Sequence, residues 1–211
     1  MATLAPAPDI QRVLSEIKTF VWQFADKGVV ETESGSTFIG PLSRGSLFFL
    51  HKIFRGSSNT EISNVAAILG FDLPADYIEF LLWSNGAALF DNSLFLYGTR
   101  GNLARETLPE ALAPPLLLSE VDSYRRLDRS ESKAPVGSIV GREKSFFLML
   151  HKDGGFSIED GAGGVRHFDC FLQGIIIILK LLSLLSNERG LLDESGHGVD
   201  VEFTAMVAAI D

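Results

Sequence analysis

One cysteine and one nearby histidine are the first candidates for chemistry in this sequence. Cys170 follows His167 by three positions, and a thiol beside an imidazole can form a nucleophile with its base. Such partners meet in space, so the spacing alone does not establish a catalytic pair. Because Cys170 stands beside Phe168 and Phe171, the pattern favours a small buried hydrophobic residue over a nucleophile.

The four histidines and the glycine-rich segment 160–165 are the candidates for a metal site and a phosphate site. None of the histidines has another His, Cys, Asp or Glu at the spacing of a zinc site on a convincing helix. The segment DGAGGV lacks both the G-x-G-x-x-G spacing and the lysine of a phosphate-binding loop, and it lies between two strand-like runs. We therefore expect no metal and no cofactor. The histidines are His51, His151, His167 and His197.

Two adjacent carboxylate pairs, Glu159-Asp160 and Asp193-Glu194, could carry acid–base chemistry if they were buried close together. Both pairs lie near glycine or serine, which is typical of solvated loops. We therefore predict no catalytic residue, and we expect that the protein is not an enzyme.

The charge balance bounds the possible partners. The net charge is −9, whereas nucleic-acid backbones select faces rich in Lys and Arg, so we expect no nucleic-acid partner. A negative surface suits a basic protein partner, and it equally serves to keep a protein soluble. With one cysteine no intramolecular disulfide can form, which fits a reducing compartment. The apolar segment 171–185 is too short to span a membrane, and the N-terminus lacks a signal peptide, so we expect a cytoplasmic protein.

The N-terminal half reads as helices and a possible hairpin. Apolar periodicity predicts a helix from Asp9 to about Phe24, with Asp9 as its N-cap. Two strand-like runs, 36–40 and 46–54, come next and could form the hairpin. Ser58 and Glu61 have the form of a capping box for a second helix, which Gly70 would end.

The C-terminal half reads mainly as strands. A third helix is predicted from Pro74 to Asn85-Gly86, followed by a strand at 93–97, a surface loop to about 115 and a short helix within 116–127. Strands are predicted at 138–141, 145–152, 155–160 and 165–168, with a hairpin turn at 153–155. Asp169 could cap a closing helix through Leu185, and the tail would add an edge strand or a docked helix. This order indicates an α+β fold.

The segment LGFDLPADYIEFLLWSNGAALF, residues 69–90, resembles the signature of the SUKH superfamily. That superfamily groups bacterial toxin-immunity proteins, the fungal Smi/Knr cell-wall regulators and some herpesvirus proteins. The signature positions that match are Leu69, Gly70, Leu73, Pro74, Asp76, Tyr77, Phe80, Leu81, Asn85 and Gly86. Of these, Asp76 is also a candidate binding residue, and the other nine are expected to be structural.

The resemblance implies one α+β domain with a central, twisted antiparallel sheet flanked by helices. It covers residues 58–186, so 1–57 is an N-terminal helix and extension, and 187–211 a C-terminal extension. It also implies a non-enzymatic protein-binding role, most commonly the neutralisation of a cognate toxin, often a nuclease.

An acidic immunity protein could place carboxylates where a basic nuclease binds substrate phosphates. The candidate partner-binding residues are Asp72, Asp76, Glu79 and Asp91, all near the signature helix. Alternatively, Asp76 only serves the helix dipole and the others only hydrate the surface. A second functional reading is an intracellular regulatory or scaffolding adaptor, in which the N-terminal extension selects the partner.

Overall fold

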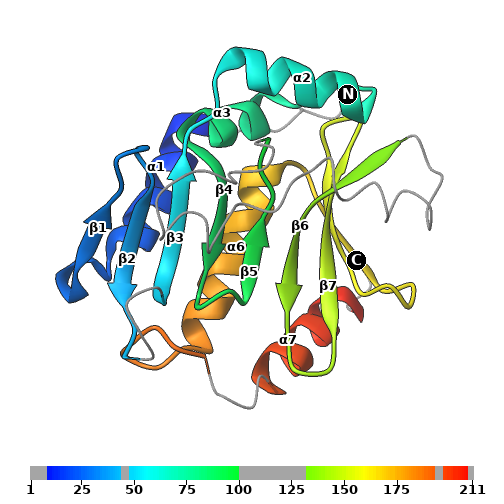
Figure 1. Ribbon diagram of the computed structural model, residues 1–211. Helices are drawn as coiled ribbons and strands as arrows, with labels where there is room; N and C mark the ends of the chain where they lie inside the picture. The colour runs from blue at the N-terminus through cyan, green and yellow to red at the C-terminus, as the bar shows by residue number, and fades with distance from the viewer. Residues whose placement is uncertain (1–8, 44–47, 100–131, 193–196, 209–211) are drawn as a thin grey trace.

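The computed structural model describes residues 9–43, 48–99, 132–192 and 197–208. Within these ranges the chain forms one nine-stranded antiparallel sheet in sequence order, together with five α-helices (Figure 1). The strands are β1 (Val29–Glu31), β2 (Thr37–Pro41), β3 (Phe49–Arg55), β4 (Ser84–Leu89), β5 (Leu94–Leu96), β6 (Lys133–Val140), β7 (Ser145–His151), β8 (Phe156–Glu159) and β9 (Val165–Phe168). The α-helices are α1 (Ile10–Trp22), α2 (Asn59–Leu69), α3 (Ala75–Trp83), α6 (Phe171–Leu184) and α7 (His197–Ala208), and a 3-10 turn, η1 (Ala25–Lys27), follows α1.

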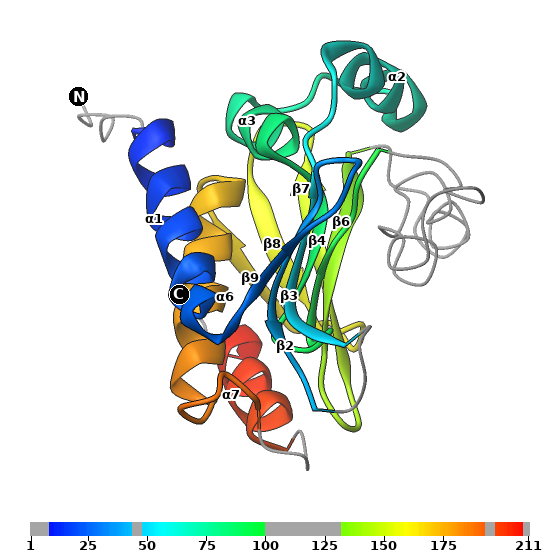
Figure 2. The ribbon, with the colours of Figure 1, turned by 60° about the vertical axis from the view of Figure 1, so that its left-hand side comes forward.

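The molecule has a sheet layer and a helix layer. Figure 2 shows α1, α6 and α7 on one face of the twisted sheet, with α2 and α3 at one end of the strands. Helix α6 is the centre of the helix layer and packs against both α1 and α3. The predicted fold class, an α+β domain with an antiparallel sheet flanked by helices, is therefore confirmed.

The sequence of α6 explains its central position. The helix carries four consecutive isoleucines and buries eight of its residues, so it is apolar on more than one face. A helix of that kind must be covered on both sides, here by the sheet and by α1. In contrast, α1 buries a single stripe, Leu14, Ile17 and Val21, as its helical periodicity predicts.

Three of the predicted helix ends are confirmed. The Asp9 side chain accepts from the Arg12 N–H, Ser58 and Glu61 form the capping box, and Gly70 ends α2 in the left-handed conformation at φ 77°. The predicted cap at Asp169 is wrong. The N-cap of α6 is Cys170, which makes no side-chain capping bond.

The predicted end of the third helix is also wrong. Helix α3 ends at Trp83, because Ser84 already has extended dihedrals, and Asn85 and Gly86 lie inside strand β4. Of the two, Gly86 does adopt a positive φ, 84°. A Cβ there would approach the Leu96 carbonyl oxygen at 2.7 Å, so the close contact with β5 requires glycine.

Most of the remaining strands follow the sequence pattern, but β6 begins at Lys133, five residues before the predicted run 138–141, and β1 was not predicted. Strands β2 and β3 pair antiparallel, as the possible hairpin requires. Strands β6 to β9 form a meander, and the turn at 153–155 joins β7 to β8 with Gly154 at φ 93°. Of the two structures proposed for the tail, residues 197–208 form the docked helix, α7. The helix predicted within 116–127 lies outside the described residues.

Candidate functional site

The signature segment builds the contact between α3 and α6. Tyr77, Phe80 and Leu81 on α3 are fully buried. The ring of Phe171, at the start of α6, lies 4.8 Å from the Tyr77 ring and 5.2 Å from the Phe80 ring, between centroids. Edge-on and tilted aromatic contacts of this kind stabilise a core beyond the area that they bury. These signature side chains therefore hold two helices together and are not available to a ligand.

The segment that leads into α3 is also buried. Leu69 and Leu73 enter the main core from either side of Gly70. Gly70 donates its N–H to the Ala66 carbonyl, which closes α2, and Pro74 precedes the first residue of α3. The left-handed glycine reverses the chain between the two helices, so that both leucines reach the same core.

Asp76, one of the candidate partner-binding residues, is buried and does not reach the surface. Its side chain is 5% exposed, and both of its oxygens accept hydrogen bonds. Oδ1 accepts from the Tyr77 N–H at 2.9 Å, and Oδ2 accepts from the Leu172 N–H at 2.9 Å. The carboxylate thus satisfies an N–H in the first turn of α6, which explains how that helix begins without a capping side chain of its own.

The other three candidate acids lie nearer the surface but at two separate places. Asp72 is exposed in the connection between α2 and α3, and Glu79 on α3 accepts from the Gln11 side chain at 2.9 Å. Asp91 lies in the turn after β4, at the opposite end of that strand from α3 (Figure 1). The structure brings Asp72 and Glu79 to one end of the sheet and Asp91 to the other.

Asn85 ties the two central strands together at the end near α3. Its Oδ1 accepts from both the N–H and the hydroxyl of Thr99, which follows β5. The Thr99 hydroxyl also lies 2.9 Å from the Ser57 hydroxyl, just before α2. A Cβ on Gly98 would meet the Asn85 carbonyl oxygen at 2.3 Å. Asn85 and Gly98 therefore serve the close approach of two backbones.

His167 and Cys170 do not form a nucleophile and base. The His167 ring lies 5.7 Å from the His151 ring, between centroids. The half-buried Cys170 thiol lies beside Asp76, and burial raises its pKa, with the Asp76 carboxylate adding to the effect. A thiol with a raised pKa is a poor nucleophile at neutral pH.

A polar chain across β6, β7 and β8 was not anticipated from the sequence. His151 Nε2 lies 2.8 Å from the Ser157 hydroxyl, which donates to Glu159, and Glu159 pairs with Lys133 at 2.9 Å. Ser157 is fully buried and stands between the histidine and the carboxylate. A catalytic triad needs the histidine in the middle, so this chain is structural. Its sequence signal is the alternation of polar residues at 157 and 159.

His51 is the histidine whose pKa is shifted furthest from its ordinary value. It is fully buried, with its ring between those of Phe24 and Phe90 at 5.3 and 5.1 Å. Its Nδ1 accepts from the Phe90 N–H. Burial lowers the pKa of His51 to about 3, and the charge of Lys27 contributes. The ring is therefore a neutral part of the core.

Sequence reasoning also missed the sheet edge formed by β1. All three residues of this strand are exposed, and two of them are valines. The only available signal was a short β-branched pair between glycines, Val29-Val30 between Gly28 and Gly35. That pattern is too short to distinguish a strand from a loop.

Among the residues that the structure describes, no group of three or more His, Cys, Asp or Glu side chains is placed to hold a metal ion. None of the helices described there is long and apolar enough to cross a membrane.

Comparison with known proteins identifies the segment that contains the signature. Residues 56–135 match the model of the SMI1 / KNR4 family (SUKH-1), a range that starts just before α2 and reaches into β6. A comparison with curated proteins finds no match. The family match contains every signature position from Leu69 to Gly86, and the antiparallel sheet with flanking helices agrees with it. Residues 56–135 of the chain are therefore similar to the SMI1/KNR4 family (SUKH-1).

Proposed function

We propose that the protein is an immunity protein that binds a cognate toxin domain and neutralises it by covering its active surface. The family match over residues 56–135 is the observation that carries the proposal. The signature helix supports it, because its signature side chains fill the core and leave the outer surface free to contact a partner. In this proposal the protein acts by binding another protein, surface to surface.

The expected partner has a basic surface, such as the substrate groove of a nuclease. The chain carries a net charge of −9, which would speed its encounter with a positive groove. Asp72 and Glu79, at the α3 end of the sheet, are the acids proposed to face the partner, and Asp91 would serve a contact at the other end. Asp76 is no longer proposed, since its carboxylate is occupied within the core.

Co-expression with the toxins encoded in neighbouring genes tests this function. Wild-type protein should restore growth and co-purify with one of them. The charge-reversing variants Asp72→Lys and Glu79→Lys should weaken the complex, whereas Glu202→Lys, an equal charge change at an exposed site on α7, serves as the matched control. If no neighbouring toxin is bound and none is neutralised, the proposal fails.

A regulatory or scaffolding adaptor is the second candidate. It is supported by the N-terminal extension, residues 1–57, which lies almost entirely before the matched range and supplies α1 and β1 to β3. In this alternative the extension would select the partner. If the protein captures a regulatory protein from the same cell, if this capture requires residues 9–55, and if the protein does not rescue cells from a toxin, the adaptor is favoured over the immunity protein.

A further inference from the structure

The edge strand β1 presents unused backbone hydrogen-bonding groups. Gly28 accepts from the Gly40 N–H and Thr32 donates to the Ser36 carbonyl, while Val30 pairs with Phe38. Hydrogen bonding in an antiparallel pair alternates along the strand. The N–H and C=O groups of the intervening residues, Val29 and Glu31, therefore point out of the sheet. Figure 1 shows β1 at the outer edge of the sheet.

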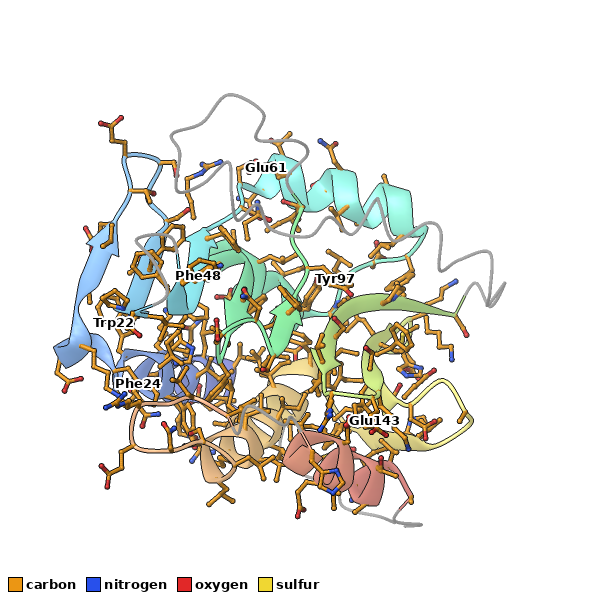
Figure 3. All side chains as sticks on the ribbon, turned by 60° about the horizontal axis from the view of Figure 1, so that its bottom comes forward. Trp22, Phe24, Phe48, Glu61, Tyr97 and Glu143 are labelled. Atoms are coloured by element: carbon orange, nitrogen blue, oxygen red, sulfur yellow. The ribbon has the colours of Figure 1, made fainter. Side chains whose placement is uncertain are left out.

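The side chains along this edge are exposed and partly apolar. Val29 is 37% exposed, Val30 42%, and Trp22 at the end of α1 41%. Figure 3 shows Trp22 on the β1 side of the molecule. Natural edge strands are commonly guarded by lysine, proline or a bulge. The three residues of β1 include neither lysine nor proline, its pairing with β2 keeps an unbroken register, and its single charged side chain is Glu31, which would repel an acidic strand but not a basic one.

The register also assigns each side chain to a face of the sheet. Val30 pairs with Phe38, which packs with Phe49 and Phe54 in a separate cluster. Glu31 pairs with Thr37 and therefore faces the opposite side, the side covered by the helices. An added strand would meet Val30 on one face and, on the other, the Glu31 carboxylate next to Val29. Its own side chains would have to alternate between apolar and basic residues.

The charges near the edge favour a basic occupant over a second copy of the chain. Asp26, Glu31 and Glu33 are exposed within eight consecutive positions. The ammonium group of Lys27, the single basic residue among these positions, donates to the Glu188 carbonyl and lies over the Phe24 ring. A second copy would bring its own carboxylates to the same edge, whereas lysine or arginine side chains would neutralise them.

We propose that β1 is a strand-addition site that takes an extended partner segment of alternating apolar and basic residues. The incoming backbone would bond to Val29 and Glu31, its apolar side chains would extend the Phe38 cluster beside Val30, and its basic side chains would meet Glu31. This inference rests on the proposed function only in taking the partner to be a basic protein. Its first test needs no toxin, so the two can fail separately.

The test uses the full chain labelled with ¹⁵N and a short peptide of alternating lysine and valine. Addition of the peptide should slow hydrogen exchange at the Val29 and Glu31 amides about tenfold or more, and it should leave the Val30 amide, already paired with β2, unchanged. A peptide of alternating glutamate and valine should give no protection. Glu31→Lys should reverse this preference between the two peptides.

A proline variant tests the outward N–H of Val29 without disturbing the fold. Val29→Pro removes one outward N–H and keeps the bonds to β2, and Gly28, with ψ 145°, accepts a following proline. It should abolish the protection while the circular dichroism spectrum stays unchanged. Protection that is absent, lies elsewhere or is equal for both peptides would overturn the proposal. The proposal would also be overturned if the protein formed a dimer that Val29→Pro dissociates. It would equally be overturned if Val29→Pro left a complex with the toxin intact.

Discussion

The carboxylate of Asp76 joins the beginnings of two helices that lie 96 positions apart in the sequence. Its Oδ2 accepts from the Leu172 N–H at 2.9 Å, and its Oδ1 accepts from the Tyr77 N–H on its own helix. Helix α6 has no capping side chain at Cys170, so Asp76 supplies the missing acceptor. The acidic residue of the signature is thereby a structural link between α3 and the central helix of the core.

Removal of this link should destabilise the protein. We expect Asp76→Ala to lower the free energy of unfolding by about 2–3 kcal/mol, because it leaves two buried N–H groups without a charged acceptor. Asp72→Ala, at an exposed position four residues earlier, should change it by less than about 0.5 kcal/mol. Urea denaturation of both variants measures the difference. Equal losses of unfolding free energy in the two variants would show that the hydrogen bonds of Asp76 do not stabilise the fold.

Two glycines with positive φ, Gly70 and Gly86, allow the cost of backbone strain to be compared with the cost of strain plus a steric contact. Gly70→Ala should cost about 1–2 kcal/mol, since φ is 77° and a Cβ there meets no atom within 4 Å. Gly86→Ala should cost more, roughly 3 kcal/mol or above, because the positive φ is combined with a contact to the Leu96 carbonyl oxygen. Thermal and urea unfolding provide the comparison. A ranking in the reverse order would contradict the contact between β4 and β5.

His51 should make the protein sensitive to acid. Its folded-state pKa of about 3 lies below the ordinary value of 6.5, so the unfolded chain binds a proton first and stability falls as the pH drops below about 6.5. Between about pH 7 and about pH 4 this single group should remove about 3 kcal/mol. His51→Asn keeps an acceptor for the Phe90 N–H but does not titrate.

The pH dependence of unfolding in the two proteins gives the check for His51. The free energy of the His51→Asn variant should be lower near neutral pH but should decline less steeply on acidification. Parallel curves for the variant and the wild type would mean that His51 is accessible to protons in the folded state.

The capping box at the start of α2 should contribute about 1 kcal/mol to the free energy of unfolding. The Ser58 hydroxyl accepts from the Glu61 N–H, and the Glu61 carboxylate accepts from the Ser58 N–H at 2.7 Å. Ser58→Ala removes the first of these bonds and should lower the free energy of unfolding by that amount. Thr60→Ala, in the same turn but outside the box, should have no destabilising effect. If both alanine variants match wild type, the box contributes nothing to stability.

Local signals in the sequence predicted local structure well. The caps of α1 and α2 depend on residues within one turn, so Asp9, Ser58, Glu61 and Gly70 could be read directly. The same logic failed at α6. Asp169 is close in sequence, but the acceptor is Asp76, and no local pattern indicates a partner from another helix.

The strands show the second limit of sequence reasoning. Asn85-Gly86 is a common turn pair, yet here it lies in β4 because pairing with β3 and β5 overrides the local preference. Strand β1 has three residues and no burial, so no periodicity could indicate it. Among the candidate binding acids, sequence proximity placed Asp72 and Glu79 together correctly but could not separate Asp91, because that separation depends on the direction of β4.

The most direct test of the proposed function is a binding measurement between this chain and an inactivated toxin domain from an adjacent gene. Isothermal titration calorimetry should show a one-to-one complex at about 0.05 M salt that weakens at about 0.3 M, because opposite surface charges are screened. Loss of growth rescue in the variants with reversed charges should follow the loss of affinity. Absence of binding at low salt to every adjacent toxin domain would contradict the proposal that the protein is an immunity protein.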